Sequence, residues 1–259
     1  MTTAHSALQR FVTRLLLRSS LTPVEQDTIL GLACRTAHIS ARHEIVSPGK
    51  AVDHACLVAK GLAARFDQMR GGQRQITAFH IVGDMCDLHS VVAPTPAWGI
   101  VALTATTVLF VPHARLRAMA CTHPAIAMAF WRDGTVDASI LAKWIGNIGR
   151  QDARARLAHL ICEFGTRSEL AGIGSRTSFA LDATQEQLAD ALGLTSVHVN
   201  RTLQRLRSEG VVSTRGHAVD VLDWERLADI AEFDPTYLLV NQGPVESPRF
   251  RAVTDRVVN

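Results

Sequence analysis

The sequence predicts an α+β protein: a β-roll or jelly roll, then a long helix, then a C-terminal winged helix-turn-helix. Between residues 36 and 112, short β-rich runs alternate with turn signals, which is typical of an all-β sandwich or jelly roll. Thr184–Gly210 has the pattern of a helix-turn-helix, and two strand-like runs follow it. The expected parts are 1–122 for the N-terminal helices and β-roll, 123–149 for the long helix, 150–225 for the winged helix-turn-helix and 226–259 for a C-terminal tail.

Composition allows two ordinary packed domains and excludes few classes of protein. The chain has 259 residues, 47% of them apolar, and a net charge of +3, which gives weak support for a nucleic-acid partner. No apolar stretch is long enough to cross a membrane. Arg10, Arg14 and Arg18 interrupt the N-terminal leucines, so we expect an amphipathic helix there rather than a secretory signal. The five scattered cysteines form no CxxC pair, which favours a reducing cytoplasm.

The first part should begin with helices and continue with strands. Residues 1–34 have helical character, and Thr22-Pro23-Val24-Glu25 has the order of a cap, a first-turn proline and an acid that starts a helix. Gly71-Gly72 is the clearest hairpin turn. The expected strands lie in the runs 55–59, 62–69, 74–81 and 100–111.

A short helix at His113–Cys121 and a longer one to about Ile148 should follow. The second half of the longer helix carries an apolar stripe, formed by Ile140, Leu141, Trp144, Ile145 and Ile148. A two-fold partner helix is the simplest cover for this stripe, so we expect a homodimer; packing on the chain's own β domain is the alternative. Gly146 and Gly149 predict a hinge before a further helix over Gln151–Glu169, which buries Leu157, Leu160, Ile161 and Phe164.

The helix-turn-helix can be assigned position by position. Thr184 is a cap for a first helix with Leu188, Ala189 and Leu192 inside, and Gly193 supplies the turn, where a positive φ is easiest for glycine. Thr195 or Ser196 then caps a second helix, from about 196 to 208, which buries Val199, Leu203 and Leu206.

The outward face of this second helix predicts DNA binding. Hydrogen-bond donors and arginines on a short helix with an apolar underside suit the major groove of double-stranded DNA. The two runs around Arg215-Gly216 resemble a wing whose tip, Arg215 and His217, can reach a phosphate. The candidate DNA-binding residues are Gln185, Thr195, Ser196, Val197, His198, Asn200, Arg201, Arg205 and Arg215. A buried helical hairpin, or a winged helix that binds protein or a ligand without contacting DNA, is the alternative.

Two glycine turns in the β domain complete a family resemblance. Lys60-Gly61 and Gly83-Asp84 each follow a strand, and with the winged helix-turn-helix they make residues 20–225 resemble the Crp/Fnr family of bacterial transcription regulators. The resemblance implies a sensor role for the β-roll and a homodimer that reads a palindromic site. It also implies contact with RNA polymerase if the protein is an activator.

Family residues carry over only in part. In the cAMP receptor protein of this family an Arg-Glu pair opens the recognition helix and another Arg follows five residues after the first. Here Ser196 and Val197 occupy the first two positions, and only Arg201 matches. Arg201 is therefore expected to bind guanine, Asn200 can read adenine, and Val197 can contact a thymine methyl. We expect a site that differs from the TGTGA half-site of the cAMP receptor protein. His198 and Thr202 are expected phosphate contacts, and Arg205 a backbone contact or a solvated residue.

The ligand of the β-roll is not expected to be cAMP. The cAMP-binding members carry a Gly-Glu pair for the ribose and an Arg-Ser pair for the phosphate, and residues 85–90 and 94–99 contain neither. A buried phosphate needs a cation or several donors, and none is evident in these segments. The candidate pocket residues are Asp84, Cys86, Asp87 and Trp98, with Asp87 either a ribose ligand or a turn acid.

Other chemistries find less support in the sequence. The cysteines lack the spacing of an iron–sulfur cluster, and the β-domain histidines lack metal-ligand spacing, so no cofactor and no metal are expected. A redox role for Cys86 or Cys162 is one hypothesis. The alternative is that both are small buried side chains with only a packing role. A cupin-type enzyme is the least expected alternative, because no metal triad, nucleophile–base pair or phosphate loop is present.

Overall fold

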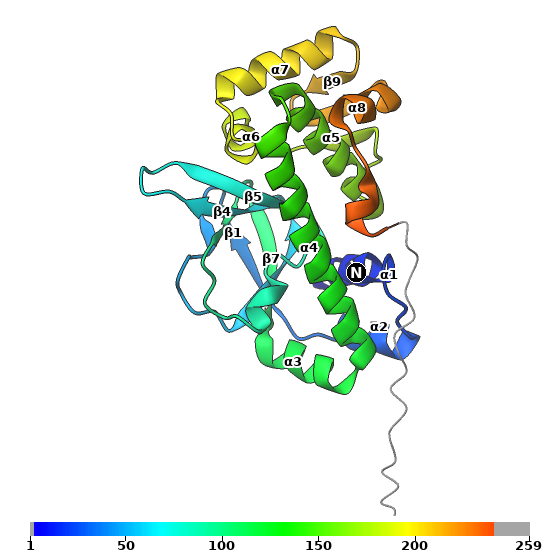
Figure 1. Cartoon of the computed structure of the whole chain (residues 1–259). Helices are drawn as coiled ribbons and strands as arrows, with labels where there is room; N and C mark the ends of the chain where they lie inside the picture. The colour runs from blue at the N-terminus through cyan, green and yellow to red at the C-terminus, as the bar shows by residue number, and fades with distance from the viewer. Residues whose placement is uncertain (1–2, 241–259) are drawn as a thin grey trace, which may run out of the picture.

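The computed structural model describes residues 3–240 and confirms the predicted α+β architecture (Figure 1). A β-roll lies on one side of a long helix, and the winged helix-turn-helix lies at the end of that helix remote from the N-terminal helices. The extended tail expected from Pro244 and Pro248 lies outside the described residues.

Two N-terminal helices precede the β-roll. Helix α1 spans Thr3–Leu16 and buries Leu8, Phe11 and Leu15. Helix α2 spans Pro23–Leu30 and starts where the sequence predicts, with a capping box between Thr22 and Glu25.

The β-roll consists of two facing antiparallel sheets. Strands β1 (Arg35–Ile39), β7 (Thr106–Pro112) and β3 (His54–Lys60) form one sheet in the order β1-β7-β3. Strands β2 (Glu44–Val46), β6 (Gly99–Ala102), β4 (Ala63–Gln68) and β5 (Arg74–His80) form the other in the order β2-β6-β4-β5. Gly71-Gly72 turns between β4 and β5 as predicted, with Gly72 at φ +83°. The short 3₁₀ helix η1 spans Leu88–Val91 between β5 and β6.

The apolar run 100–111 is two strands, not one. The chain leaves β6 after Ala102 and returns in β7 at Thr106. Hydroxyls of this turn satisfy the backbone of the preceding glycine turn: Leu62 N–H donates to Thr104 Oγ1 at 2.9 Å, and Thr106 Oγ1 donates to Leu62 O at 3.1 Å. Polar threonines at the break are the sequence signal for this turn.

Three helices connect the β-roll to the C-terminal part. They are α3 (His113–Thr122), α4 (Pro124–Arg150) and α5 (Ala153–Leu170). The predicted hinge at Gly146 and Gly149 is wrong, because α4 runs through both glycines. The break falls at Gln151 and Asp152, where the Asp152 side chain accepts from Ala155 N–H at 2.8 Å and caps α5. The four residues expected on the inner side of α5 are all buried.

The C-terminal part is a winged helix-turn-helix with one more strand and one more helix than predicted. Helices α6 (Gln185–Leu192) and α7 (Ser196–Ser208) precede the wing strands β9 (Val212–Arg215) and β10 (Ala218–Val221). Strand β8 (Ser178–Ala180) completes a sheet in the order β8-β10-β9. Helix α8 (Trp224–Ala231) crosses the expected boundary at residue 225, and a 3₁₀ turn η2 (Pro235–Leu238) follows. The predicted tail is therefore folded up to this turn.

One hydrophobic cluster runs through both domains. It includes Phe66 and Phe79 of the β-roll, Trp144 of α4, Phe164 of α5 and Val199 of α7, all buried. Helix α6 packs on β5, and Gln75 Nε2 donates to Ala191 O at 3.3 Å. The winged helix-turn-helix is therefore docked against the β4–β5 hairpin.

The apolar stripe of α4 divides between the interior and the surface. Ile140 and Trp144, expected to meet a partner helix, instead lie in the chain's own core at 3% and 6% exposure. Leu141 and Ile148 are half-buried, and Ile145 is 64% exposed. The prediction is wrong for Ile140 and Trp144 because α4 packs against β5 and α5, contacts that a helical wheel does not show.

Candidate functional site

The turn between α6 and α7 has the predicted geometry. Thr184 caps α6 in a capping box with Gln187, and Thr195 caps α7 by accepting from His198 N–H at 3.2 Å. Gly193 adopts φ +64° and ψ +41°, the left-handed region that disfavours other residues. These local rules fix the crossing of the two helices, with Ala189 and Val199 buried between them and the core.

Helix α7 presents its polar face to solvent. All eight positions predicted to face outward are exposed: Ser196, Val197, His198, Asn200, Arg201, Gln204, Arg205 and Arg207. Figure 1 shows α7 at the outer edge of the molecule, with its outer side uncovered by any other described element. Among the described residues, Arg201 has no hydrogen-bond or ion-pair partner, so its guanidinium is available to a ligand.

Four candidate residues near this face have partners within the chain. Asn200 Nδ2 donates to Gln185 Oε1 at 3.0 Å, so two predicted contacts form one exposed pair. Arg205 Nε pairs with Glu209 at 3.0 Å, an i,i+4 bridge that holds it along the helix. Thr202 is buried, and its hydroxyl donates to His198 O at 2.8 Å, so the expected phosphate contact at Thr202 is wrong.

The wing extends the same exposed surface. Arg215 ends β9 and is exposed, followed by Gly216 at φ +59°. His217, the other residue of the wing tip, has its Nδ1 3.8 Å from the Asp182 carboxylate. Arg215 thus lies at the wing tip where it is predicted to reach a phosphate.

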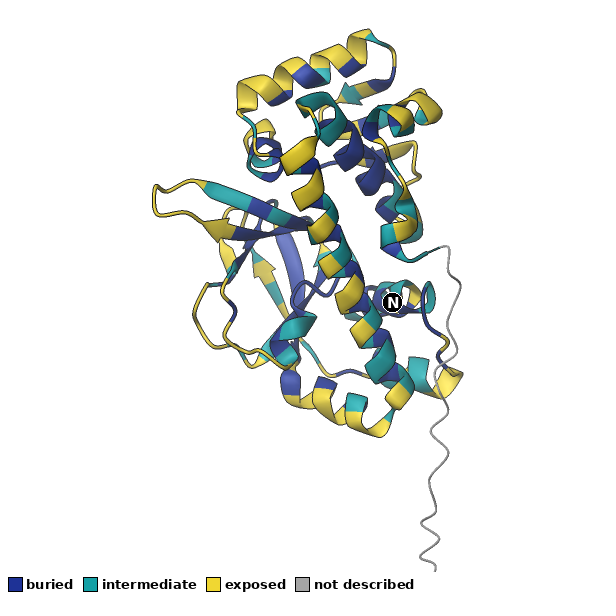
Figure 2. Ribbon diagram, in the orientation of Figure 1, coloured by how far each residue is buried: buried dark blue, intermediate teal, exposed yellow. Residues whose placement is uncertain are grey.

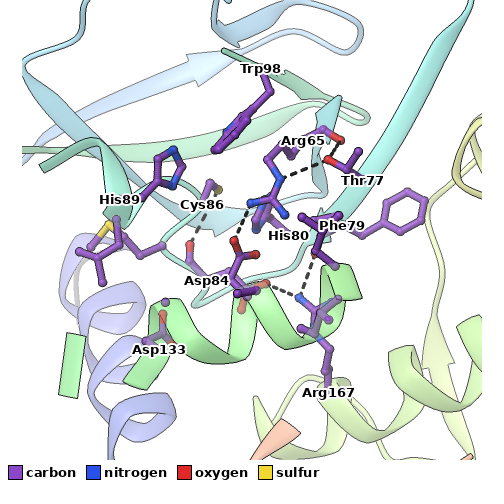
Figure 3. A pocket seen from close by; sticks show the side chains of 18 of the residues that line it. Arg65, Thr77, Phe79, His80, Asp84, Cys86, His89, Trp98, Asp133 and Arg167 are labelled. Carbon is purple, nitrogen blue, oxygen red and sulfur yellow. Dashed lines mark hydrogen bonds and ion pairs between the residues drawn. The ribbon is translucent and has the colours of Figure 1, made fainter. Parts of the chain in front are cut away.

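A cavity of about 390 Å³ lies between the β-roll and α4 (Figure 3). Asp84, Cys86 and Trp98 line it, as predicted, and α4 contributes Asp133 and Asp137. Asp87 does not line it: the Asp87 carboxylate turns toward β3 and accepts from Cys56 N–H at 2.6 Å. Asp87 is thus the turn acid of the two alternatives, and burial raises its pKa to about 7.

Cations line the cavity, contrary to the expectation from residues 94–99. Arg65 of β4, Arg14 of α1 and Arg167 of α5 all reach it, each from an element distant in sequence from the predicted pocket. Arg65 Nη1 pairs with Asp137 at 2.5 Å and Arg65 Nε donates to Thr77 Oγ1 at 3.2 Å. The sequence signal available was the helical spacing of Arg10, Arg14 and Arg18, but their inward direction depends on tertiary packing.

A buried charge network joins the cavity to α5. Asp84 accepts from Arg14 Nη1 and from Arg167 Nη2, each at 2.7 Å. Arg167 also pairs with Glu163 at 3.1 Å, and Glu163 accepts from Trp144 Nε1 and Tyr237 Oη, each at 2.9 Å. Burial opposes ionisation of Asp84, but the charges of Arg14 and Arg167 outweigh it and lower the pKa of this carboxyl. The network therefore connects α1, the β5 turn, α4, α5 and η2.

The two cysteines considered for redox chemistry are buried. Burial raises the pKa of the Cys162 thiol to about 12 and that of Cys86 well above its ordinary value. Both are therefore held as thiols near neutral pH, which lowers their reactivity. Within residues 3–240 no group of three His, Cys, Asp or Glu side chains has the arrangement of a metal site.

Comparison with known proteins agrees with both halves of the fold. A cyclic nucleotide-binding domain model matches residues 36–123, and a Crp-like helix-turn-helix domain model matches residues 155–230. The solved structure of FixK2 from Bradyrhizobium japonicum aligns with a TM-score of 0.71 over 77% of this chain and 98% of that chain, at 24% identity. This similarity shows that the fold is shared.

Curated relatives are transcription regulators. The fumarate and nitrate reduction regulatory protein of Vibrio cholerae is 22% identical over 220 residues, which cover 85% of this chain and 88% of that protein. The nitrogen fixation regulation protein FixK of Azorhizobium caulinodans is 26% identical over 182 residues, which cover 70% and 73%. Together the β-roll, the long helix and the exposed α7 define a DNA-binding transcription regulator gated at its sensor domain. The chain belongs to the Crp/Fnr family.

No helix among the described residues has the length and apolar character needed to cross a membrane.

Proposed function

We propose that this regulator works as a homodimer that inserts α7 of each protomer into successive major grooves of a palindromic site. The observation that carries the proposal is the exposed polar face of α7 with Arg201 unpaired at its centre. Arg201 binds guanine, Asn200 and Val197 contact neighbouring bases, and Arg215 binds a phosphate. Gln185 and Asn200 can exchange their mutual hydrogen bond for DNA.

The exposed side of α4 supports the dimer. Trp131 is 73% exposed and Ile145 is 64% exposed, fourteen residues apart, with exposed Ala138 midway between them. Gly134, Leu141 and Ile148 repeat at the same interval of seven, so the two sets form the a and d positions of a coiled coil. Large apolar side chains at this spacing on a helix surface are best covered by a second copy of the same helix. Figure 2 shows exposed residues along the visible side of α4.

Gating follows from the position of the cavity. Gly134, Ala138 and Leu141 line the cavity and also belong to the exposed heptads of α4. A ligand in the cavity thus touches the dimer helix directly, and Arg167 connects the cavity to α5. The resulting population shift would change the separation of the two α7 helices.

The rest of the proposal concerns partners and chemistry. We infer a cytoplasmic protein without catalytic activity that binds RNA polymerase if it activates transcription. cAMP is not proposed as its ligand, since Asp87, the acid considered for a ribose, is bonded to Cys56 N–H and does not line the cavity. A metal or iron–sulfur cofactor is not part of the proposal. An interaction protein whose winged helix does not bind DNA is the alternative.

A gel-shift experiment tests the proposal against that alternative. The upstream region of the protein's own gene is used as the probe, with wild type, Arg201→Ala and Arg207→Ala. Arg201→Ala should lose sequence-specific binding, whereas Arg207→Ala should weaken binding to all sequences alike and reduce its salt dependence. Equal thermal melting of the three proteins shows that folding is intact. Absence of DNA binding by folded wild type would overturn the proposal.

A further inference from the structure

Unpartnered buried nitrogen atoms gather at the cavity. Among the described residues, Arg65 Nη2, His80 Nε2, His89 Nε2 and Trp98 Nε1 are buried without a hydrogen-bond partner, and all four residues line it. Buried polar groups in folded proteins almost always have partners, because an unmade hydrogen bond costs free energy. Several such atoms around one cavity indicate a site built for a ligand.

The chemistry of these atoms specifies the ligand's polar end. Arg65 Nη2 and Trp98 Nε1 can only donate, so the ligand must supply acceptors. The Trp98 ring centroid lies 5.5 Å from the Arg65 guanidinium carbon and 5.0 Å from the centroid of the His89 ring, so two obligate donors and a histidine lie together in one region (Figure 3). Burial lowers the pKa of His89 and brings that of His80 to about 4, so both are neutral near pH 7. A planar carboxylate, with two acceptor oxygens, fits a guanidinium edge and an indole N–H.

The remaining lining limits the charge and shape of the ligand. Asp67, Asp84, Asp133 and Asp137 line the cavity with the three arginines, so the cavity offers no surplus positive charge for a multiply charged phosphate. Leu88, Ile140 and Leu141 provide apolar surface on the η1 and α4 side. The ligand should therefore carry one negative charge at one end and an apolar body at the other.

Resting on the proposed function, we propose that the sensor cavity binds a small aromatic or alicyclic monocarboxylic acid. Its carboxylate accepts from Arg65 and Trp98, and its ring packs on Leu88 and Leu141. The carboxylate competes with Asp137 for Arg65, because the Arg65–Asp137 bridge is the contact between β4 and α4 at this point. Binding would thereby release α4 from the β-roll at the helix that carries the dimer face.

Calorimetric titration of the full chain tests this inference. The probes are benzoate, phenylacetate and cyclohexanecarboxylate, with phenylacetamide as the uncharged match, acetate as the head group alone and cAMP as the family ligand. We expect saturable binding of at least one ring carboxylate, and binding at least about tenfold weaker for phenylacetamide, acetate and cAMP. Binding of none of the three ring acids at millimolar concentration, or tighter binding of phenylacetamide or cAMP, overturns the inference.

Variants locate the site. Arg65→Gln and Trp98→Phe should each weaken binding by roughly tenfold, and Asp137→Asn should strengthen it by removing the competitor. Arg74→Gln is the control: Arg74 lies in the adjacent strand β5 over Phe66, outside the cavity, and its loss should leave binding unchanged. Equal effects of Arg65→Gln and Arg74→Gln, or weaker binding by Asp137→Asn, overturn the inference. The gel shift with DNA but without any added acid tests the proposed function separately from this inference. DNA binding that persists when no acid binds would overturn the inference and leave the proposed function standing.

Discussion

Asp84 and Arg167 form a buried ion pair, 2.7 Å between Oδ2 and Nη2, that joins the turn after β5 to helix α5. Both side chains are almost completely buried, and Arg14 binds the other oxygen of Asp84. Both residues line the sensor cavity, and Arg167 belongs to the helix that leads into the winged helix-turn-helix. The strength of this ion pair therefore bears on both folding and gating.

Asp84→Asn should lower the free energy of unfolding by about 2–4 kcal/mol, because it leaves two buried arginines with one carboxylate fewer. This loss of stability is smaller than the loss expected for a buried arginine without any ion-pair partner, because Arg14 still pairs with Asp133 and Arg167 still pairs with Glu163. Urea unfolding at pH 7 measures the change. Asp67→Asn removes an exposed carboxylate at the rim of the same cavity and should be neutral. Equal stabilities of the two variants would contradict the assigned role of the pair.

Asp87 should make stability depend on pH. Burial raises its folded-state pKa to about 7, from an ordinary value of 3.8, so the native state holds a proton that the unfolded state releases. The free energy of unfolding should therefore fall as pH rises from about 4 to about 7, with a slope of at most ~1.4 kcal/mol per pH unit from this group. Asp87→Asn should abolish that contribution. Unfolding curves between pH 5 and 8 measure how the free energy of unfolding depends on pH. If this dependence survives in Asp87→Asn but is lost in Asp67→Asn, the assignment to Asp87 is refuted.

Val197→Glu should change the base preference of the protein. A glutamate at this exposed position can accept from cytosine N4, which is worth about 1–3 kcal/mol of discrimination at one base pair. Selection of bound DNA from a random pool should recover half-sites other than TGTGA for wild type. The variant should gain a C·G pair at one position. Gln204→Glu adds the same charge later on α7 and should not change that position. Recovery of TGTGA by wild type would disprove the expectation.

Ile145→Glu should dissociate the dimer. The side chain is exposed in one protomer and lies at a repeated a position, so a charge there would be buried against its counterpart. We expect the dimer dissociation constant to rise by roughly tenfold or more. Sedimentation measures the dissociation constant. Val24→Glu places the same charge on an equally exposed residue of α2 and should leave the dimer intact. A dimer insensitive to Ile145→Glu would place the interface elsewhere.

Local rules explain which parts of the site could be predicted. The caps at Thr184 and Thr195 and the positive φ of Gly193 depend on a few neighbouring residues, so the sequence alone located the turn and the exposed face of α7. The arginines of the cavity could not be found this way. Arg14, Arg65 and Arg167 meet only because α1, β4 and α5 pack together, and no local pattern relates them.

The errors have the same physical origin. Ile140 and Trp144 form a regular stripe with Leu141 and Ile148, but periodicity identifies an apolar face without saying which surface covers it. The β-roll and α5 cover Ile140 and Trp144 and leave Leu141 and Ile148 half-buried. Thr202 likewise lies on the polar helix but turns its hydroxyl to His198 O, a local alternative that side-chain polarity does not reveal.

The hydrophobic cluster shared by the two domains has a consequence for how the protein unfolds. Phe79, Trp144 and Phe164 stack edge to face across the boundary between the β-roll and the DNA-binding part. Neither part can melt without exposing aromatic surface of the other, so heating should give one calorimetric transition rather than two. A C-terminal half cut free at Gln151 would carry an uncovered Phe164 and should aggregate. If a sensor domain or a DNA-binding domain were exchanged between relatives, the aromatic residues on both sides of this contact would have to be exchanged with it.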